Sequence, residues 1–507
     1  MSGQLLIRAD ADGRIGTGHV MRCLALAQAW RRLSGGPVVF AGRIESAPLR
    51  QRLRDEGFSL CSLPVPASPE AEAAFLAERF SDPVGGWLAL DGYHFDAAWQ
   101  LALRAAGLRL LVIDDAVRLP LYHADCLLNP GIHAETLRYP CEGEPLQLLG
   151  CNYALLREEF TARMEEALPV TGRVRNLLLT MGGADPGDCT KDILLALAKT
   201  GRKDLRVRAV LGGANPHRPA LAGLLPELPF PCELLEASRD MAGLMRHADA
   251  AISAAGTTVY ELAAMGVPFL SVVIAANQRH NAAAFASAGA AGSLGEAPLA
   301  GRDGVAERIA AFLEDGQQRQ RQAEIGRRLV DGRGASRVAA ALLAAEIELR
   351  PATWADRMLL LRWANQPATR RHSFHSAPIS QAEHERWIAG KLADRGCRLW
   401  LLRGLGSTPF GVVRFDVDGD RAEISVNLDE EFQGLGIGGR AIALACDRLL
   451  AEHPCRIEAR VKEGNPASLR AFAGAGFVES TRAERQGVPF VTLVRNPESH
   501  DARPHHR

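Results

Sequence analysis

Short apolar runs alternate with amphipathic stretches along the first part of the chain, and this alternation predicts its fold. Continuous apolar runs that end in Asp, Asn or Gly are typical of parallel strands buried on both faces. Between the runs, apolar residues recur at helical spacing, as at Val20, Cys23, Leu24 and Ala27. The predicted strands are LLIRAD (5–10), PVVFAG (37–42), WLALDGY (87–93), LRLLVIDD (108–115) and DCLLNP (125–130). Residues 1–168 therefore predict a doubly wound α/β half.

The same pattern restarts near residue 170. Here NLLLTMGGAD (176–185) precedes a helical stretch, and RVRAVLGGANP (206–216), CELLE (232–236) and PFLSVVIAANQ (268–278) follow. Residues 169–345 thus predict a second doubly wound half, and two such halves commonly bind a ligand between them.

From residue 346 to 495 the pattern changes to that of a separate α+β domain. A helix is predicted to begin at Ser380, which has capping-box spacing to Glu383. Several β-type runs and a glycine-rich turn follow. The polar tail, 496–507, is expected to be disordered, and His505 and His506 are interpreted as part of a frayed terminus rather than as metal ligands.

Composition places the chain among ordinary globular proteins. Its 507 residues are 47% hydrophobic and 23% charged, and 59 Lys and Arg balance 59 Asp and Glu, which argues against a nucleic-acid partner. Neither a membrane span nor a signal peptide is visible, so a cytoplasmic location without a membrane partner is expected. The 10 cysteines show no CxxC spacing and no Asp-x-Asp pair stands out, so no metal is expected.

A glycine-rich segment after residue 430 carries the clearest motif of the last third, a Q-x-x-G-x-G pattern between a predicted strand and a helix. Glycines let backbone N–H groups approach a pyrophosphate, and a helix N-terminus favours negative charge. The pattern alone fits a flexible strand-to-helix turn equally well. The candidate binding residues are Gln433, Gly434, Gly436, Gly438, Gly439 and Arg440.

Further motifs give this region a resemblance to a known family. GNPASLRAFAGAGFVE (464–479), with Asn465, and LRPATWAD (349–356) resemble segments of the GNAT acetyltransferases. The resemblance covers the whole domain. It implies that acetyl-CoA binds at Gln433–Arg440 together with Asn465, that two central strands splay apart, and that an acetyl group is moved to an amine.

The resemblance also implies an acid that protonates the departing thiolate, which in this family is often a tyrosine. Phe472 stands at the corresponding position and has no proton to donate. Water or another residue then supplies the proton, or the domain is slow or degenerate. Glu423 and Ser425 are the candidates for handling the amine proton, although a solvent-facing strand residue is the other interpretation of Glu423.

His19 stands at a predicted corner between a glycine-rich loop and the first turn of a helix. Gly13, Gly16 and Gly18 allow the chain to bend there. A histidine in this position is either catalytic or a solvated first-turn residue, and its spacing leaves both open.

Four blocks in the front region add a second resemblance. RADADGRIGTGHVMR (8–22), NYALLREEF (152–160), MGGAD (181–185) and ISAAGTTVYELAAMGVPFLSVVIAANQ (252–278) resemble, in order, segments of the UDP-sugar hydrolases of pseudaminic acid biosynthesis. The resemblance implies a fold like that of the GT-B glycosyltransferases. It implies hydrolysis of a UDP-linked diacetamido-trideoxy-L-altrose, with His19 matching the catalytic histidine.

This chemistry requires an activated water and a grip on the departing UDP. A neutral imidazole suits the first task, and Asp10, at the end of the first strand, is a candidate to orient it. A helix N-terminus suits the second, and Glu261 could accept ribose hydroxyls or act as a capping carboxylate. The predicted substrate-binding residues are Gly16, Thr17, Gly18, Gly183, Asp185, Gly256, Thr257, Thr258, Glu261, Asn277 and Gln278, with Gly182 and its neighbours ranked lower.

The two resemblances fit consecutive steps, because LRPATWADRMLLLRWANQPATRRHS (349–373) and ISQAEHERW (379–387) also resemble the acetyltransferase of the same pathway. That enzyme acetylates the 4-amino group of a UDP-amino-sugar and so makes the substrate of the hydrolase. The predicted partners are thus a UDP-linked amino sugar and acetyl-CoA. The alternatives are a GT-B glycosyltransferase with an acetyl-CoA-binding but inactive module, or the same chemistry on a different UDP-amino-sugar.

Overall fold

The computed structural model describes residues 3–13, 15–63, 68–80, 86–164, 172–183, 185–213, 215–236, 240–485 and 487–497. His505, His506 and most of the predicted tail lie outside these residues. The chain divides into two compact units, one formed by Gln4–Arg32 with Gly36–Val338 and the other mainly by the residues after Val338.

The first sheet is parallel throughout, with the strand order β3-β2-β1-β4-β5-β6-β7. Its strands are β1 (Leu5–Ala9), β2 (Val38–Ala41), β3 (Ser59–Cys61), β4 (Trp87–Asp91), β5 (Leu110–Ile113), β6 (Cys126–Asn129) and β7 (Leu146–Leu149). Its helices are α1 (Gly18–Ser34), α2 (Ala47–Asp55), α3 (Pro69–Phe80), α4 (Ala97–Ala105) and α5 (Glu158–Thr161), with short 3₁₀ turns η1 (Ala134–Thr136) and η2 (Cys151–Tyr153). The strand order reverses between β1 and β4, where such sheets bind ligands.

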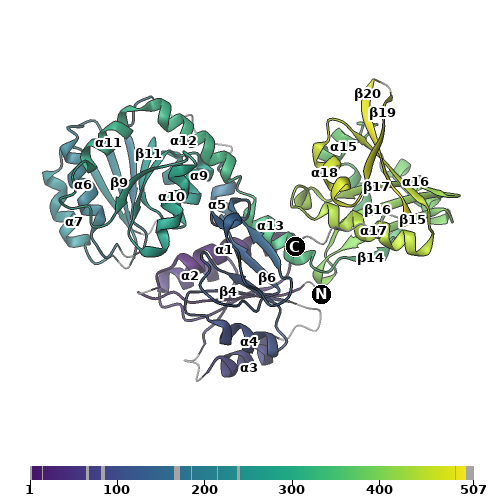
Figure 1. Ribbon diagram of the computed structural model, residues 1–507, viewed down its shortest axis with the longest axis horizontal. Helices are drawn as coiled ribbons and strands as arrows, with labels where there is room; N and C mark the ends of the chain where they lie inside the picture. Colours follow the sequence, from purple (N-terminus) through teal and green to yellow (C-terminus); the bar gives the residue numbers. More distant parts are fainter. Residues whose placement is uncertain are drawn as a thin grey trace. The chain divides into compact units, whose positions relative to one another are not determined.

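The second sheet is also parallel, with the order β10-β9-β8-β11-β12-β13. Its strands are β8 (Asn176–Thr180), β9 (Arg206–Leu211), β10 (Cys232–Glu236), β11 (Ala250–Ala254), β12 (Phe269–Val273) and β13 (Gly292–Glu296). Its helices are α6 (Cys189–Lys199), α7 (Arg218–Leu224), α8 (Met241–Arg246), α9 (Thr258–Met265), α10 (Arg279–Ser287), α11 (Val305–Glu314) and α12 (Gly316–Leu329), with η4 (Leu225–Glu227) and η5 (Ala276–Gln278). Helix α13 (Gly334–Leu343) follows and begins beside α1 of the first half, where Arg32 donates to Ser336 at 2.6 Å. Helices surround this sheet in Figure 1, which explains why β11 and β12 are fully buried.

The third sheet, in the other unit, has the order β14-β15-β16-β17-β18-β20-β19. Its strands are β14 (Glu348–Pro351), β15 (Cys397–Arg403), β16 (Pro409–Asp418), β17 (Arg421–Leu428), β18 (Arg456–Lys462), β19 (Val478–Arg485) and β20 (Val488–Arg495). Its helices are α14 (Arg357–Ala364), α15 (Pro367–His372), α16 (Gln381–Ala393), α17 (Gly438–Glu452) and α18 (Pro466–Gly474), with η6 (Trp354–Asp356), η7 (Leu405–Ser407) and η8 (Glu430–Phe432). The predicted capping box is present, since Ser380 and Glu383 bond reciprocally at the start of α16.

Strands β17 and β18 are parallel neighbours that stay paired over only three residues, from Arg421 to Glu423 on β17. Beyond that point β17 continues to Leu428 and β18 continues to Lys462 without pairing to each other. The predicted splay of two central strands is therefore confirmed, as is the succession of two doubly wound halves and an α+β domain.

Candidate functional site

His19 lies in the first turn of α1, directly after the glycine-rich loop that follows β1. Gly16 takes a left-handed conformation with φ of 76°, which a side chain would strain, and the loop closes through a bond from its N–H to Asp12. The His19 side chain is buried, and its Nδ1 lies 2.7 Å from Oδ1 of Asp91. The corner predicted from the sequence thus presents a histidine held by a buried carboxylate.

Asp91 is the last residue of β4 and contacts three side chains of α1: His19, Arg22 and Cys23, whose Sγ donates to it at 3.4 Å. Arg22, one turn after His19, donates from Nε and Nη2 to its two oxygens, each at 2.6 Å. Burial favours the protonated carboxyl, but the charges and hydrogen bonds of Arg22 and His19 outweigh it and hold the pKa of Asp91 far below its ordinary value. Asp91 therefore stays ionised beside the imidazole.

An ionised Asp91 determines what His19 can do. Nη2 of Arg22 also lies 3.3 Å from Nδ1, but the contact with Asp91 is much shorter. Because a carboxylate only accepts hydrogen bonds, this shorter contact places the proton of the neutral imidazole on Nδ1. Its Nε2 then holds the lone pair and can accept a proton, and Asp91 stabilises the imidazolium that results. This is the arrangement of a general base with an orienting carboxylate.

The hypothesis that Asp10 orients His19 is wrong. Asp10 accepts hydrogen bonds from Arg8 at 2.5 Å and from the backbone N–H of Arg43 at 2.8 Å, and it pairs with His94 at 3.1 Å. Burial opposes its ionisation, but the bonds from His94 and Arg8 hold the pKa of Asp10 well below its ordinary value. Asp91 lies beside the end of β1 in the sheet and takes the expected role.

Tyr93, two residues after Asp91, is a second neighbour of His19 that the sequence analysis missed. The two rings meet edge to face with their centroids 4.9 Å apart. The Tyr93 hydroxyl donates to Asp115 at 2.8 Å and accepts a hydrogen bond from Nδ2 of Asn277 at 3.0 Å. Asn277, a predicted substrate-binding residue of η5, is thus joined to the His19 corner.

The segment after β11 places two predicted residues side by side. A Cβ atom at Gly256 would lie 3.6 Å from Nε2 of Gln278, whose Oε1 accepts from the N–H of Ile274. Thr257 occupies the N-cap position of α9 but makes no side-chain capping bond, and Thr258 begins the helix. The N–H groups of Val259 and Tyr260 donate to the carbonyls of Gly256 and Thr257, so the donors of this turn that can face an anion are those of Thr257 and Thr258.

Glu261, in the same first turn, is engaged with the segment that leads into α5. Its Oε1 accepts from Arg157 at 2.8 Å, and burial raises the pKa of Glu261 above its ordinary value. Its contact with a ribose stays a prediction.

Asp185 is engaged with the first turn of α6. It is 1% exposed and accepts hydrogen bonds from the N–H groups of Cys189 and Thr190 and from the Thr190 hydroxyl, so it caps the start of α6. The contact of Asp185 with a substrate stays a prediction. Gly183 packs against Gly212, where a Cβ atom would meet its carbonyl oxygen at 2.1 Å.

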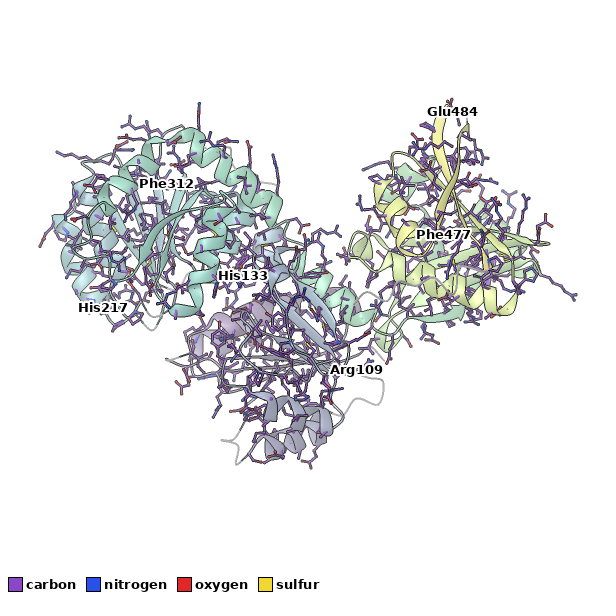
Figure 2. The ribbon with its side chains drawn as sticks, viewed as in Figure 1. Arg109, His133, His217, Phe312, Phe477 and Glu484 are labelled. Atoms are coloured by element: carbon purple, nitrogen blue, oxygen red, sulfur yellow. The ribbon has the colours of Figure 1, made fainter. Side chains whose placement is uncertain are left out.

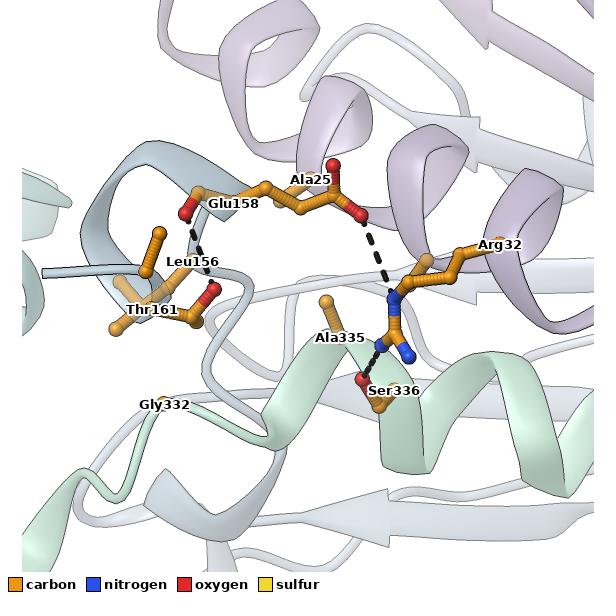
Figure 3. A pocket seen from close by; sticks show the side chains of 10 residues that line it. Ala25, Arg32, Leu156, Glu158, Thr161, Gly332, Ala335 and Ser336 are labelled. Atoms are coloured by element: carbon orange, nitrogen blue, oxygen red, sulfur yellow. Dashed lines mark hydrogen bonds and ion pairs between the residues drawn. The ribbon is translucent and has the colours of Figure 1, made fainter. Parts of the chain in front are cut away.

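The cavity drawn in Figure 3 is separate from these residues. It has a volume of about 370 Å³ and is lined by α1, α5 and residues 332–336, including Arg32, Glu158 and Ser336. None of the predicted site residues lines it.

In the other unit, the predicted acetyl-CoA loop has the conformation that its glycines allow. Gly434 and Gly436 have φ of 69° and 88°, and no atom lies within 4 Å of a Cβ built at Gly436. Gln433 donates to the Leu428 carbonyl at 2.8 Å and so ties the loop to the end of β17. Gly438, Gly439 and Arg440 then form the first turn of α17.

Glu423 and Ser425 project from the exposed face of β17, because the residues between and before them, Ile424 and Ala422, are buried. Glu423 is the last residue of β17 paired with β18, and it forms an ion pair with Arg460 at 3.4 Å. Ser425 lies two residues further, where the strands have parted.

Asn465 and Phe472 both serve α18. The Asn465 side chain accepts from the N–H of Ser468 at 3.1 Å and caps the helix. Phe472 is 5% exposed and packs edge to face on Phe477, with centroids 5.0 Å apart. The position that would carry the family's tyrosine is thus part of the apolar core.

Two family profiles match the chain. Residues 346–478 match the acetyltransferase (GNAT) domain, and residues 195–331 match the glycosyltransferase family 28 C-terminal domain. Within the described residues there is no group of three or more His, Cys, Asp and Glu side chains that could hold a metal ion. In that same part of the chain, no helix has the length and apolar character needed to cross a membrane.

The chain is similar in sequence to three proteins from other organisms. The spore coat polysaccharide biosynthesis protein SpsG of Bacillus subtilis is 32% identical over 222 residues, 43% of this chain, and the match spans only 65% of SpsG. The UDP-2,4-diacetamido-2,4,6-trideoxy-beta-L-altropyranose hydrolase of Campylobacter jejuni is 26% identical over 294 residues, 56% of this chain and 97% of its own length. An uncharacterized protein of Methanocaldococcus jannaschii is 22% identical over 505 residues, 97% of this chain and all of its own.

Proposed function

We infer that the chain is a bifunctional enzyme that acts twice on the same UDP-linked amino sugar. The inference rests on the union of two regions: one is homologous to a UDP-sugar hydrolase and contains a glycosyltransferase family 28 C-terminal domain, and the other is a GNAT acetyltransferase domain. The first region hydrolyses UDP-2,4-diacetamido-2,4,6-trideoxy-beta-L-altrose to UDP and the free sugar, a step of pseudaminic acid biosynthesis. The second region acetylates the 4-amino group of the preceding UDP-sugar. The two reactions would then follow each other on one chain.

The 2.7 Å contact between His19 and Asp91 is the observation that carries the hydrolysis. Nε2 of His19 takes a proton from water as the water oxygen bonds to the anomeric carbon of the sugar. The bond between that carbon and the diphosphate oxygen breaks, and UDP leaves with the electron pair. Asp91 stays ionised and stabilises the imidazolium, which returns its proton to solvent.

The departing diphosphate needs compensating positive charge. The N–H groups of Thr257 and Thr258, at the start of α9, would supply backbone donors, and the helix adds the positive end of its dipole. Gln278 lies beside Gly256, and Asn277 reaches Tyr93 next to His19. We expect Gly16, Thr17 and Gly18 to face the sugar, because they immediately precede the histidine.

The residues of the second region fit acetyl-CoA. Left-handed glycines with open space above Gly436 allow a diphosphate to approach the backbone, and α17 begins directly after them. Acetyl-CoA supplies the acetyl group. Glu423 and Ser425, on the exposed face of β17, are the candidates for handling the amine proton. Solvent would supply the proton for the thiolate, because Phe472 has none to donate.

One incubation tests both activities. The protein is mixed with the UDP-4-amino-sugar and acetyl-CoA in ¹⁸O-labelled water, and products are followed by mass spectrometry and by thiol release. We expect acetylation first, then a free sugar carrying one ¹⁸O and an unlabelled UDP. Label in UDP, or transfer of the sugar to another acceptor, would overturn the hydrolytic mechanism, and absent thiol release would overturn the acetyl transfer.

The variant His19→Ala gives the matching control. We expect it to lose UDP release by a factor of about 10² or more, because a positioned general base contributes that much. Binding of UDP, followed by calorimetric titration, and thiol release should be unchanged. Normal hydrolysis by this variant would show that another residue activates the water.

A further inference from the structure

Cationic and aromatic side chains gather at the far ends of the splayed strands β17 and β18. Helix α15 lies across these ends, since the Thr369 hydroxyl donates to Asn427 of β17 at 3.0 Å and Lys462 of β18 donates to the Arg371 carbonyl at 3.2 Å. This is also the end of β17 from which the acetyl-CoA loop leaves. The cationic cluster, as we call it, consists of Arg371, His372, Phe374, Lys462, Arg485 and Phe490.

The cluster is built around the ring of Phe374. Nζ of Lys462 lies 5.9 Å and Cζ of Arg485 lies 5.4 Å from the centre of this ring. Phe490 meets Phe374 edge to face at 5.6 Å, and it stands directly opposite Lys462 in the ladder of β18 and β20. Three strands and one loop thus bring two cations over the ring of Phe374, with Phe490 against its edge.

The segment that carries Phe374 is held in place by hydrogen bonds from Arg370. Its guanidinium donates to the carbonyls of Ala364, His375 and Ala377 and to the Ser373 hydroxyl. Because its donors are used within the segment, Arg370 acts as a scaffold, and a ligand would meet a surface that is already ordered.

Carboxylates that would neutralise the cluster are lacking among the residues that the structure describes: Arg371, Lys462 and Arg485 form no ion pair there. The pKa of His372 is lowered by burial and then by the charges of Arg371 and Lys462, with no carboxylate acting against them. Glu484, labelled in Figure 2, neighbours Arg485 along β19, where adjacent side chains point to opposite faces. Elsewhere on β19, Arg482 is paired with Glu479 at 2.7 Å and Glu463 at 3.5 Å.

Like charges that gather without counterions favour an anionic ligand. Arg and Lys bind phosphate oxygens through charge-assisted hydrogen bonds, and an aromatic ring offers a face on which a base can stack. We propose that the cationic cluster binds the nucleoside diphosphate part of the acceptor, leaving the amino sugar to extend toward Ser425 and Glu423. This inference rests on the proposed acetyl transfer, because it names how that domain recognises its acceptor.

The test measures thiol release by the full-length protein with Lys462→Met and Arg485→Met, which keep most of each side chain's apolar length. We expect each to raise the KM for the UDP-amino-sugar about ten-fold with kcat unchanged, as expected when a hydrogen bond to a charged group is lost from ground state and transition state alike. The inhibition constant of UDP, used as a competitive inhibitor, should rise by the same factor. The KM for acetyl-CoA should stay constant. Arg482→Met is the matched control on the same hairpin and should change none of these values.

Two outcomes would overturn the inference: an unchanged acceptor KM, or a rise in the KM for acetyl-CoA, which would assign the cluster to coenzyme A. A titration of UDP into the full-length protein separates this inference from the proposed function. We expect two UDP per chain in the wild type and one in the double variant, even if no acetyl group is transferred. One UDP per chain in both proteins would contradict the cluster while leaving the hydrolase site in place.

Discussion

At the scale of single residues, two aspartates at the ends of neighbouring strands have different tasks. Asp91 holds His19 and Arg22, whereas Asp10 closes a network with Arg8 and His94. Both are buried and ionised, so charge alone does not separate them. Their hydrogen-bond partners distinguish them. Substitution of each aspartate by asparagine therefore tests the two roles separately.

Asp91→Asn should lower the kcat for UDP release by about 10²-fold or more. An asparagine amide can donate to Nδ1 of His19, which would move the imidazole proton to Nε2 and remove the base. Stopped assays of UDP release, with UDP binding as the check of folding, measure this. Asp10→Asn is the control and should retain the wild-type pH dependence of turnover; equal losses in both variants would contradict the assignment.

Asp10 should instead matter for acid stability. Its folded pKa lies below the unfolded value of about 3.9, so the stabilisation from its ionised form is complete above that pH and is lost as the pH falls toward the folded pKa. The difference in unfolding free energy between wild type and Asp10→Asn should therefore narrow by about 1 kcal/mol between pH 6 and pH 3.4. Urea titrations at both pH values measure it, and a constant difference would refute it.

At the scale of elements, the sequence predicts strands and helices well because their apolar periods are distinct. The capping box at Ser380 and the loop-to-helix corner at His19 were also predictable, since each depends on residues close in sequence. The choice of Asp91 over Asp10 was not, because it depends on β4 lying beside β1 in the sheet. The same holds for Tyr93 and Asn277, which are 184 residues apart, and for Asp185, whose capping role depends on the turn into α6.

The loop before α17 offers a prediction at this scale. Gly436→Ala should weaken acetyl-CoA binding and lower the melting temperature, because φ of 88° strains any residue with a Cβ. Gly419→Ala is matched to it, since Gly419 has φ of 59°, open space around its Cβ position and a place in the distant β16–β17 turn.

Both variants should lose about 1 kcal/mol of stability, but only Gly436→Ala should raise the KM for acetyl-CoA. Differential scanning and thiol-release kinetics give the two quantities. An equal KM for acetyl-CoA in both variants would mean that the loop does not hold the coenzyme.

At the scale of the whole molecule, the two compact units carry different predicted sites. The hydrolase residues, from Asp10 to Gln278, belong to the first unit, and the acetyltransferase residues belong to the second. Each unit has its own sheet or sheets and its own buried core, so each should unfold in a transition of its own and respond to the ligands that it binds.

Calorimetric unfolding should accordingly show two transitions. In the Lys462→Met/Arg485→Met double variant, in which we expect UDP to bind only the hydrolase site, UDP at 100 times its Kd should stabilise the first unit alone by about 2.7 kcal/mol, and acetyl-CoA should stabilise only the second. His19→Ala should leave the stabilisation by both ligands unchanged, because the variant lacks the general base but keeps its folded structure. A single transition that both ligands move together would contradict independent units.

The hydrogen bonds that Asp91 makes with both His19 and Arg22 should constrain how these positions change in evolution. Arg22 also donates to Asp115, which accepts a hydrogen bond from Tyr93. One connected hydrogen-bond network therefore joins five side chains, those of His19, Arg22, Asp91, Tyr93 and Asp115. A lineage that replaced Asp91 or Arg22 alone would leave a buried charge without its partner. Among descendants of this gene, the five positions should consequently be inherited as a block or replaced as a block, and a sequence survey would reveal them as a single covarying group.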